Sequence, residues 1–538
     1  MIRQHESIWM AFLLLAGLTI PCGSSRADFN ADGGDLLVPQ ATSYTQEYGR
    51  VACNPTGTLF GVAFESVVNH DVYVRLFDHA GAALTGDILV NPTLNNYIQD
   101  EPTIAFDAAG NFIVAWSDRS AFDGDSMGIF ARIFDSSGNP KGPEFQVNLN
   151  GAESQWEPNA TALPDGAWAV TWSGTFSGDA FFRIFEPNGT PRTGDVQANT
   201  LTNNAQIDTE IAANRSGELF LVYIDYGGHG GVGTATNVYG RRFDSQGQAL
   251  DPAEFLVNEN TLSGDQRDVR VGADGFNGWV LVWEDRLNDG SGKGIYGRLY
   301  RDSTPQGPEF LVNQTTEDDQ ALPALAVDWM GNFVVAYESW QSGDSDILAR
   351  RFDASGQPLG AEFLVNQSPT GSQINPSVAV DWAGQDFVFV YTGPGAASQD
   401  VFVRRFRNEP VKVVGPPALG ASFQLALDLP SGAGLTYLVV GSLQTSPGIP
   451  LPDGRHLDLA NDVLLASTLA FPNSGPYFFN FQGTLDAAGQ ATATVAIPND
   501  PRLSGLNAYF AVITLDSGSP GLFSALRHVT ESILVSIP

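Results

Sequence analysis

The sequence contains few residues suited to covalent or metal chemistry. Its 538 residues include 2 cysteines, 4 methionines and 6 histidines. Cys22 lies in an N-terminal segment typical of a removable signal, so Cys53 is the only cysteine expected in the mature chain, which excludes an internal disulfide. The histidines are scattered along the sequence, and no histidine metal cluster or Ser-His-Asp arrangement is predicted. We assign no catalytic residue from such motifs.

Positive charge is also scarce. The chain has 27 Lys and Arg against 60 Asp and Glu, a formal net charge of −33. An acidic surface repels phosphate backbones and anionic lipids, so no nucleic acid is expected as a partner. Charged residues make up only 16% of the sequence, which excludes a long charged helix or coiled coil.

Long apolar runs are missing beyond the N-terminus. Residues 1–27 are typical of a signal peptide, with Arg3 followed by the apolar stretch 8–20 and a small-residue cleavage site at 25–27. The apolar stretch is shorter than the roughly 20 residues that a membrane-spanning helix needs. We therefore expect no transmembrane segment after signal removal, and a secreted, extracellular or cell-surface location.

Turn residues are plentiful, with 58 Gly and 32 Pro, and they punctuate an internal repeat. Each of seven units contains an Arg, one further residue and an aromatic. The seven pairs are Arg75/Phe77, Arg132/Phe134, Arg183/Phe185, Arg241/Phe243, Arg298/Tyr300, Arg350/Phe352 and Arg404/Phe406. Four short strands separated by turns fit in each unit, a pattern that predicts the blades of a β-propeller. The fold class is therefore all-β, with a seven-bladed β-propeller over residues 28–409.

The last unit lacks its fourth strand. It ends after Phe406, whereas residues 35–39 near the N-terminus align with the fourth strand at 362–366. Pairing of this N-terminal strand with the last blade would close the ring and remove two exposed sheet edges. The displaced strand thus favours a closed ring over an open stack.

An acid begins each fourth strand. The seven acids are Asp35, Asp87, Glu144, Asp195, Glu254, Glu309 and Glu362. Since the planar fork of Arg suits carboxylates, we expect these acids to form structural ion pairs with the seven repeat arginines, within or between blades.

The repeat ends at a proline-rich linker, residues 410–417. Residues 418–538 keep strand and turn signals without the repeat, and we expect a separate β-sandwich domain. Its role is either that of a solubilising spacer or that of a sorting or surface-retention domain.

Binding residues are expected on the face with the long loops, around the mouth of the central channel. Acids with Gly and Ser between them suit Ca²⁺, although acidic turns are also commonly solvated. The candidate metal ligands are Asp123, Asp125, Asp289, Asp344 and Asp346. Trp156 and Trp340, expected in loops, are candidates for stacking on a ligand. No cofactor is required; Ca²⁺ is the one ion considered.

Two segments resemble known repeats. Residues 28–35 resemble the acidic loop of FG-GAP propellers, one residue short before the last Asp. The unit 342–366 looks like a repeat of exported bacterial proteins, including large repeats-in-toxin-type adhesins. This resemblance implies bacterial export, a surface or extracellular location and often calcium, with no catalytic residues to transfer.

Two functions remain open from sequence. The favoured one is a secreted, non-catalytic binding, adhesion or scaffold protein that presents an acidic loop face, stabilised by calcium, to an unknown protein or glycan ligand. The alternative is a carbohydrate-active propeller enzyme, a glycoside hydrolase or lyase, that uses carboxylates at the channel mouth. An irregular cluster of acids and aromatics at the mouth would distinguish the enzyme.

Overall fold

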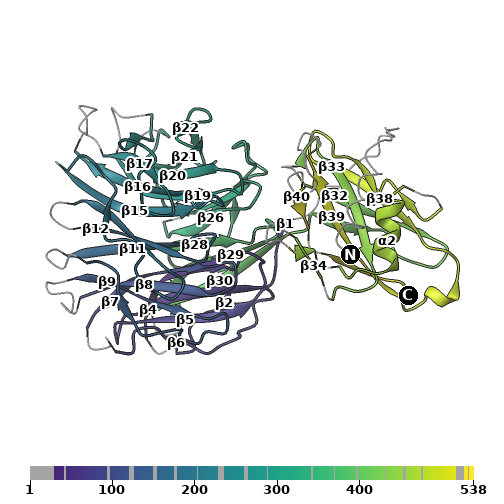
Figure 1. Cartoon of the computed structure of the whole chain (residues 1–538), viewed down its shortest axis with the longest axis horizontal. Coiled ribbons are helices and arrows are strands. Elements are labelled where there is room, and N and C mark those ends of the chain that lie inside the picture. Colours follow the sequence, from purple (N-terminus) through teal and green to yellow (C-terminus); the bar gives the residue numbers. More distant parts are fainter. Residues whose placement is uncertain are drawn as a thin grey trace. The chain divides into compact units, whose positions relative to one another are not determined.

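The computed structural model describes residues 29–41, 44–93, 97–119, 127–149, 154–174, 178–202, 204–227, 236–259, 265–286, 289–340, 343–368, 370–395, 398–429, 432–446, 448–451, 456–457, 459–473, 476–516, 526–530 and 532–538. The expected signal peptide, residues 1–27, lies outside this range. The described chain divides into two compact units, Phe29–Asn408 and Glu409–Pro538. Both are built almost entirely of antiparallel strands (Figure 1).

Phe29–Asn408 contains seven antiparallel sheets; six are formed by strands that follow one another along the chain, and the seventh combines the last three strands with two N-terminal strands. In chain order they are sheet 1, β3(Gln46–Cys53), β4(Leu59–Ser66), β5(Asp71–Asp78) and β6(Ile88–Leu89); sheet 2, β7(Gln99–Phe106), β8(Phe112–Asp118), β9(Gly128–Phe134) and β10(Phe145–Gln146); sheet 3, β11(Gln155–Ala162), β12(Trp168–Gly174), β13(Ala180–Phe185) and β14(Val196–Gln197); and sheet 4, β15(Ala205–Ala213), β16(Leu219–Tyr226), β17(Asn237–Phe243) and β18(Phe255–Leu256). They continue with sheet 5, β19(Gln266–Ala273), β20(Gly278–Arg286), β21(Lys293–Arg301), β22(Thr304–Pro305) and β23(Phe310–Leu311); sheet 6, β24(Gln320–Val327), β25(Phe333–Ser339), β26(Asp346–Phe352) and β27(Phe363–Leu364); and sheet 7, β28(Ile374–Val380), β29(Asp386–Pro394) and β30(Gln399–Asn408).

The second strand of each sheet is the most deeply buried. Every residue of β4, β8, β12 and β25 is buried. These strands are rich in Val, Ile, Phe, Trp and Tyr, which fill both faces of a strand that lies between neighbouring sheets. Each hydrophobic cluster of this unit joins two adjacent sheets, as Trp116 of sheet 2 does with Val74 of sheet 1.

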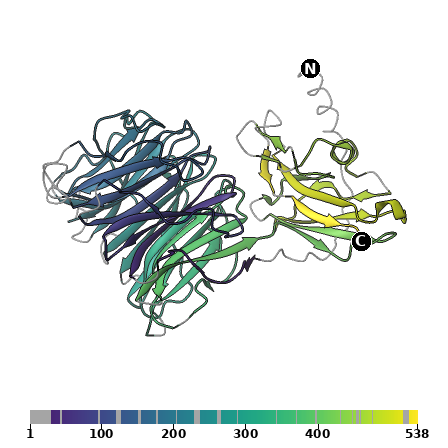
Figure 2. The same cartoon turned by 90° about the horizontal axis from the view of Figure 1, so that it is seen from below.

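The first strands of the seven sheets contact one another in a closed cycle. Contacts run from β3 to β7, β11, β15, β19, β24 and β28, and β28 contacts β3 again. We call these seven strands the inner ring. Figures 1 and 2 show the sheets side by side in chain order, from purple through teal to green. The arrangement is that of a propeller-like all-β fold.

The N-terminal strand closes the ring as predicted. β2(Leu36–Leu37) pairs with β30, Leu36 opposite Val403. A further strand that the sequence did not predict, β1(Phe29–Ala31), pairs with the end of β30. The Phe29 ring packs against Phe406, and the Arg351 guanidinium lies 3.7 Å from its centre. Sheet 7 is thus completed by both ends of this unit.

The unit Glu409–Pro538 has two sheets around one core. One contains β31(Val411–Val414), β32(Ser422–Asp428), β38(Gln490–Ala496) and β36(Phe478–Phe479); the other contains β37(Gln482–Thr484), β33(Thr436–Ser442), β39(Asn507–Leu515), β40(Leu526–Val529) and β41(Ile533–Ser536). Phe423 and Val495 of the first sheet share a hydrophobic core with Val439 and Phe510 of the second.

Three elements of this unit differ from the expectation. The expected linker contains β31, which pairs with β32. Helix α2(Val463–Ala470) begins at Asp462, whose carboxylate accepts hydrogen bonds from the amides of Leu464 and Leu465. A short hairpin, β34(Ile449–Pro450) with β35(His456–Leu457), forms a separate two-stranded sheet. Among the described residues, no helix has the length and apolarity needed to cross a membrane.

Candidate functional site

A β-bulge interrupts every first strand of the inner ring at the same place. The pairing register shifts near the start of the first strand in all seven sheets, after the second residue in five of them, after the third in β15 and after the first in β28. The next residue has a positive φ, between 50° and 55°, although none is glycine. These bulge positions are Tyr48, Glu101, Glu157, Asp208, Asp268, Leu322 and Asn375. Side chains rarely adopt this conformation, and such strain gathers at functional sites.

The bulge positions do not follow the sevenfold repeat. A glutamine lies two residues earlier in every sheet and is buried throughout: Gln46, Gln99, Gln155, Gln206, Gln266, Gln320 and Gln373. By contrast, four consecutive sheets place an acid at the bulge, and the remaining three place Tyr, Leu or Asn there. Because the glutamine is the same in every sheet and the bulge residue is not, the structure of the sheet alone does not explain which residue occupies the bulge.

Glu157 of β11 and Asp208 of β15 occupy the bulge positions of the adjacent sheets 3 and 4, and their carboxyl groups interact electrostatically. Burial and the negative charges of Asp208 and Glu101 raise the pKa of Glu157 to about 8. Burial and the charge of Asp268 also raise the pKa of Asp208. With its pKa raised to about 8, Glu157 keeps its proton at neutral pH.

Glu101 is held beside this pair by two donors. Its Oε2 accepts hydrogen bonds from the Glu157 amide at 2.9 Å and from the Ser117 hydroxyl at 2.8 Å. The first of these joins sheets 2 and 3 directly. The carboxylate of Glu101 is therefore fixed in orientation next to a group that can give up a proton.

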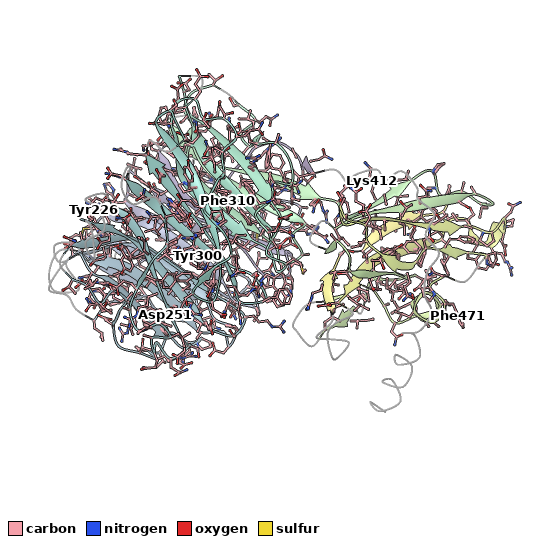
Figure 3. The ribbon with its side chains drawn as sticks, turned by 90° about the horizontal axis from the view of Figure 1, so that it is seen from above. Tyr226, Asp251, Tyr300, Phe310, Lys412 and Phe471 are labelled. Atoms are coloured by element: carbon pink, nitrogen blue, oxygen red, sulfur yellow. The ribbon has the colours of Figure 1, made fainter. Side chains whose placement is uncertain are left out.

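Aromatic side chains flank the acids. Trp156, expected in a loop, is instead the second residue of β11, opposite Ser173 and next to Glu157. Tyr226 ends β16 (Figure 3), and the Arg267 guanidinium lies 5.9 Å from its ring centre. Burial raises the pKa of Tyr226, and Asp208 contributes to the rise. Aromatic rings near carboxyl groups are suited to stacking on sugar rings.

In two of the first strands an arginine lies two residues after the bulge, Arg50 in sheet 1 and Arg270 in sheet 5. Arg270 forms a salt bridge with Glu210, Nε to Oε1 at 3.5 Å. Burial and the positive charge of Arg270 lower the pKa of Arg50, which lies across the ring in sheet 1. The positive charge of Arg270 also draws down the pKa of Asp208, against the larger effect of burial. The positive charges of Arg50 and Arg270 therefore partly compensate the negative charge of the nearby acids.

A second acid group lies on sheets 5 and 6. The Glu284 side chain is 1% exposed, and its Oε1 lies 2.9 Å from the Lys293 ammonium. Glu338 accepts the amide hydrogen of Asn375 at 2.8 Å. Burial raises the pKa of Glu338 to about 7.

The seven repeat arginines have a common structural role. Each guanidinium lies over the aromatic ring two residues on, between 5.1 and 5.7 Å from its centre. Six of them donate to a main-chain carbonyl of the preceding sheet: Arg75 to Val38, Arg132 to Val90, Arg183 to Val147, Arg241 to Ala198, Arg298 to Val257 and Arg350 to Val312. Arg404 donates to the carbonyl of Gly33 instead.

The seven acids bond the preceding sheet in the same way. Each accepts a main-chain amide hydrogen: Asp87 from Gln40, Glu144 from Thr93, Asp195 from Leu149, Glu254 from Thr200, Glu309 from Glu259, Glu362 from Gln314 and Asp35 from Gln367. Asp35 also forms a salt bridge with Arg404 at 3.9 Å. The repeat arginine and the acid of each unit therefore bond mainly to main-chain groups of the preceding sheet, rather than to each other as expected.

The candidate calcium ligands are dispersed. Asp123 and Asp125 lie outside the described residues, and Asp344 is exposed. Asp289 accepts the Ser291 amide at 3.1 Å, and Asp346 accepts the Asn366 side chain at 2.8 Å. The described part of the chain contains no group of three His, Cys, Asp or Glu arranged for a metal ion. Calcium binding stays a prediction. Trp340 follows β25 and is 39% exposed.

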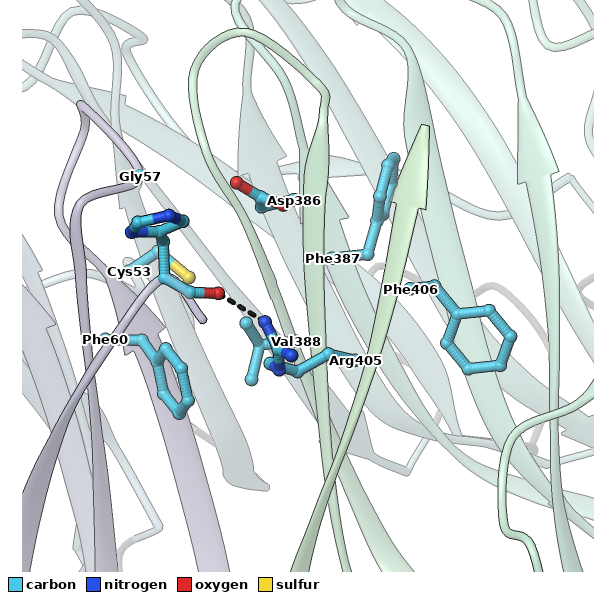
Figure 4. Close-up of a pocket in the computed structure, with 9 residues that line it drawn as sticks. Cys53, Gly57, Phe60, Asp386, Phe387, Val388, Arg405 and Phe406 are labelled. Carbon is cyan, nitrogen blue, oxygen red and sulfur yellow. Dashed lines mark hydrogen bonds between the residues drawn. The ribbon is translucent and has the colours of Figure 1, made fainter. Parts of the chain in front are cut away.

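A small pocket lies at the seam between sheets 7 and 1 (Figure 4). Cys53, Asp386 and Arg405 line it, together with His79. Arg405 donates a hydrogen bond to the carbonyl of His79. Burial and the charges of Asp381 and Asp386 raise the pKa of the Cys53 thiol well above its usual range. A protonated, buried thiol is a poor nucleophile, so the pocket does not supply a catalytic cysteine.

Comparison with family models and with curated proteins gives no match. Solved structures do match. They include a PL25 ulvan lyase bound to -[GlcA(1-4)Rha3S]-, with 12% identity, TM-score 0.47 and coverage of 68% of this chain and 95% of the other. The α-L-arabinanase of Penicillium chrysogenum with arabinobiose has 12% identity, TM-score 0.43 and coverage of 70% and 98%. Hydrazine synthase of Kuenenia stuttgartiensis has 12% identity, TM-score 0.43 and coverage of 67% and 96%.

The expectation of a non-catalytic binding, adhesion or scaffold protein is corrected here. The matched structures named above are enzymes, and two of them are carbohydrate-active. At these identities the likeness concerns the fold alone, which hosts unrelated chemistry. The irregular acid and aromatic cluster at the bulge positions is the feature that was expected of an enzyme rather than of a binding module. Reasoning from sequence missed it, although the repeated glutamine marks the position two residues before each bulge.

Proposed function

We propose that residues 29–408 form a seven-bladed β-propeller and residues 418–538 a β-sandwich. The closed cycle of first-strand contacts supports the first assignment, and the core shared by two sheets supports the second. The inner ring would then line the central channel, with the bulge positions at the mouth where the longer loops emerge.

The function that this mouth supports best is that of a carbohydrate-active enzyme, a glycoside hydrolase or a polysaccharide lyase. The observation that carries the proposal is the neighbouring acids Glu157 and Asp208 at adjacent bulge positions, with the Glu101 carboxylate held beside them by the Glu157 amide at 2.9 Å. Such enzymes need a carboxylic acid that keeps its proton at neutral pH and a second carboxylate that has lost its proton.

Glu157 is the proton donor in this proposal. With its pKa raised to about 8, it carries a proton to the glycosidic oxygen as the bond breaks. The negative charge of Asp208 disfavours the ionised form of Glu157 and so favours transfer of the proton only to a strongly basic leaving oxygen. Glu101 accepts the opposing proton, from water in a hydrolase or from a sugar carbon in a lyase. Trp156 and Tyr226 hold sugar rings by stacking.

A glycan substrate accords with export. The segment 1–27 has the pattern of a signal peptide, and we propose that the mature protein acts outside the bacterial cell, where polysaccharides occur. The acidic surface would keep such a protein soluble there.

Cleavage of a polysaccharide panel tests the function. New reducing ends report hydrolysis, and the ultraviolet absorbance of unsaturated products reports a lyase. We expect Glu157→Gln to lower the rate by about a hundredfold or more, since it removes the proton and keeps the shape. The wild-type rate should fall as pH rises through the pKa of Glu157, about 8.

Glu409→Gln is the matched control, because Glu409 is an exposed acid outside the unit that holds the candidate site. Its rate should equal that of the wild type. Absence of cleavage across neutral, acidic and amino-sugar polysaccharides, or an unchanged rate in Glu157→Gln, would contradict the proposal.

A further inference from the structure

A second carboxyl cluster lies beside Glu101, on sheets 1 and 2. Glu47 of β3 pairs opposite Glu65 of β4, and Asp100 precedes Glu101 in β7. β7 contacts both β3 and β4, which brings these side chains to one edge of the inner ring. The catalytic proposal uses Glu101 and leaves the other three carboxyl groups without a role.

Glu65 is buried without a complete set of partners. Glu65 is 6% exposed, and its Oε2 has no hydrogen-bond partner among the described residues. Asp100 Oδ1 is also unpaired within the described chain, whereas Asp100 Oδ2 takes the Arg119 guanidinium at 2.6 Å. Burial and the charges of Asp100, Glu47 and Glu101 raise the pKa of Glu65 to about 8. The cluster therefore has more carboxyl groups than Arg119 can balance as ions, and a further cation would let Glu65 lose its proton.

An aromatic ring stands at the same place. Tyr48 occupies the bulge position of sheet 1 and is 38% exposed. It follows Glu47 directly in β3, and burial and the charges of Glu47, Glu65 and Glu101 raise the pKa of its hydroxyl. An exposed aromatic ring bordered by unpaired carboxyl groups has the chemistry that recognises an ammonium group.

We propose that Glu47, Tyr48, Glu65, Asp100 and Glu101 form an ammonium subsite that binds the primary amine of an amino-sugar glycan. The inference deepens the proposed function and rests on it, since Glu101 belongs to both sites. A primary ammonium donates three hydrogen bonds, which suits several carboxyl oxygens, whereas the described residues offer no arrangement of three ligands for a metal ion. The net charge of −33 would draw a cationic glycan toward the site.

Calorimetry with two matched ligands tests the subsite. The probes are oligomers of glucosamine and of N-acetylglucosamine of equal length, and the protein is the full mature chain carrying Glu157→Gln so that no turnover occurs. We expect one glucosamine oligomer to bind per chain, at least about tenfold more tightly than its acetylated counterpart. The affinity for the glucosamine oligomer should fall as the salt concentration rises.

Adding Glu65→Gln to this background should lower the affinity for the glucosamine oligomer about tenfold and leave the affinity for the acetylated oligomer unchanged. Adding Glu409→Gln instead should change neither. Unchanged tryptophan fluorescence would show that each variant is folded. Equal binding of the two oligomers, binding of several oligomers per chain, binding that ignores Glu65→Gln, or no binding of either would overturn the inference.

The two proposals fail separately. Cleavage of a neutral or acidic polysaccharide together with no preference for the amine would overturn the ammonium subsite and keep the enzyme. Amine-selective binding in a protein that cleaves no polysaccharide would keep the subsite and overturn the enzyme.

Discussion

At the scale of single residues, the repeat arginines show how a polar side chain can stabilise an assembly of sheets. Arg183 is 6% exposed, and it donates to the carbonyls of Val147 at 2.8 Å and Thr193 at 3.0 Å. Its guanidinium also lies 5.1 Å from the centre of the Phe185 ring. One side chain thus satisfies a carbonyl of its own sheet and one of the preceding sheet.

We expect Arg183→Met to lower the free energy of unfolding by about 2–4 kcal/mol, because it removes the Arg183 donor from the carbonyl of the buried Val147 and from the half-buried Thr193, together with a cation–π contact. Arg183→Lys should recover only part of this, since an ammonium cannot span both carbonyls as a planar fork does. The measurement is urea unfolding followed by tryptophan fluorescence. Arg301→Met, at an exposed position of β21, is the control and should stay within about 0.5 kcal/mol of the wild type. A similar loss in both variants would contradict this role.

At the scale of elements, the N-terminal strands complete sheet 7. β2 and β1 both pair with β30, which would otherwise present an open edge. A chain that begins after residue 39 should therefore unfold at a lower temperature and associate through the exposed edge. Thermal unfolding and size-exclusion chromatography check this. A chain that begins at Phe29 keeps both strands and should behave as the mature protein does. Equal stability and a monomeric state in both chains would show that the strands do not close the fold.

The strands were predictable because they repeat, and the site was not. Alternating apolar residues and glycine turns recur in every unit, so the sequence located the strands and the one displaced to residues 35–39. Trp156, by contrast, was expected in a loop, because a β-bulge leaves no signature of its own in composition. Glu157 and Asp208 are 51 residues apart and meet only when consecutive first strands pack together. Asp462 before an apolar run was a usable signal for α2, yet the surrounding strand pattern obscured it.

At the scale of the whole molecule, nine of the ten tryptophans lie between residues 116 and 382, and the tenth lies in the N-terminal segment. The unit Glu409–Pro538 contains none. Tryptophan fluorescence therefore reports the unfolding of residues 29–408 separately from that of the second unit, which matters because two units need not unfold together.

This separation allows a test of the buried carboxyl groups. Burial and neighbouring acids raise the pKa of Glu65 and of Glu157 to about 8, and burial raises that of Asp328 and of Glu338 to about 7. Because these pKa values exceed those of the unfolded chain, the folded state binds more protons between the unfolded and folded values, and stability must fall as pH rises through that interval. We expect the urea midpoint seen by fluorescence to decrease steadily from roughly pH 5 to roughly pH 8.

The contribution of one group can be isolated from this slope. Glu65→Gln removes a proton-binding group. Between the unfolded and folded pKa values of Glu65, the slope of the free energy of unfolding against pH should then become shallower by up to about 1.4 kcal/mol per pH unit. Asp302→Asn, at an exposed acid of the same unit, should leave the slope unchanged. A stability that rises over this interval, or a slope that Glu65→Gln does not reduce, would mean that the carboxyl groups of the inner ring are ionised and balanced by charges elsewhere. Such a ring would also lack the proton that Glu157 is proposed to donate, so this slope tests the chemistry before any substrate is known.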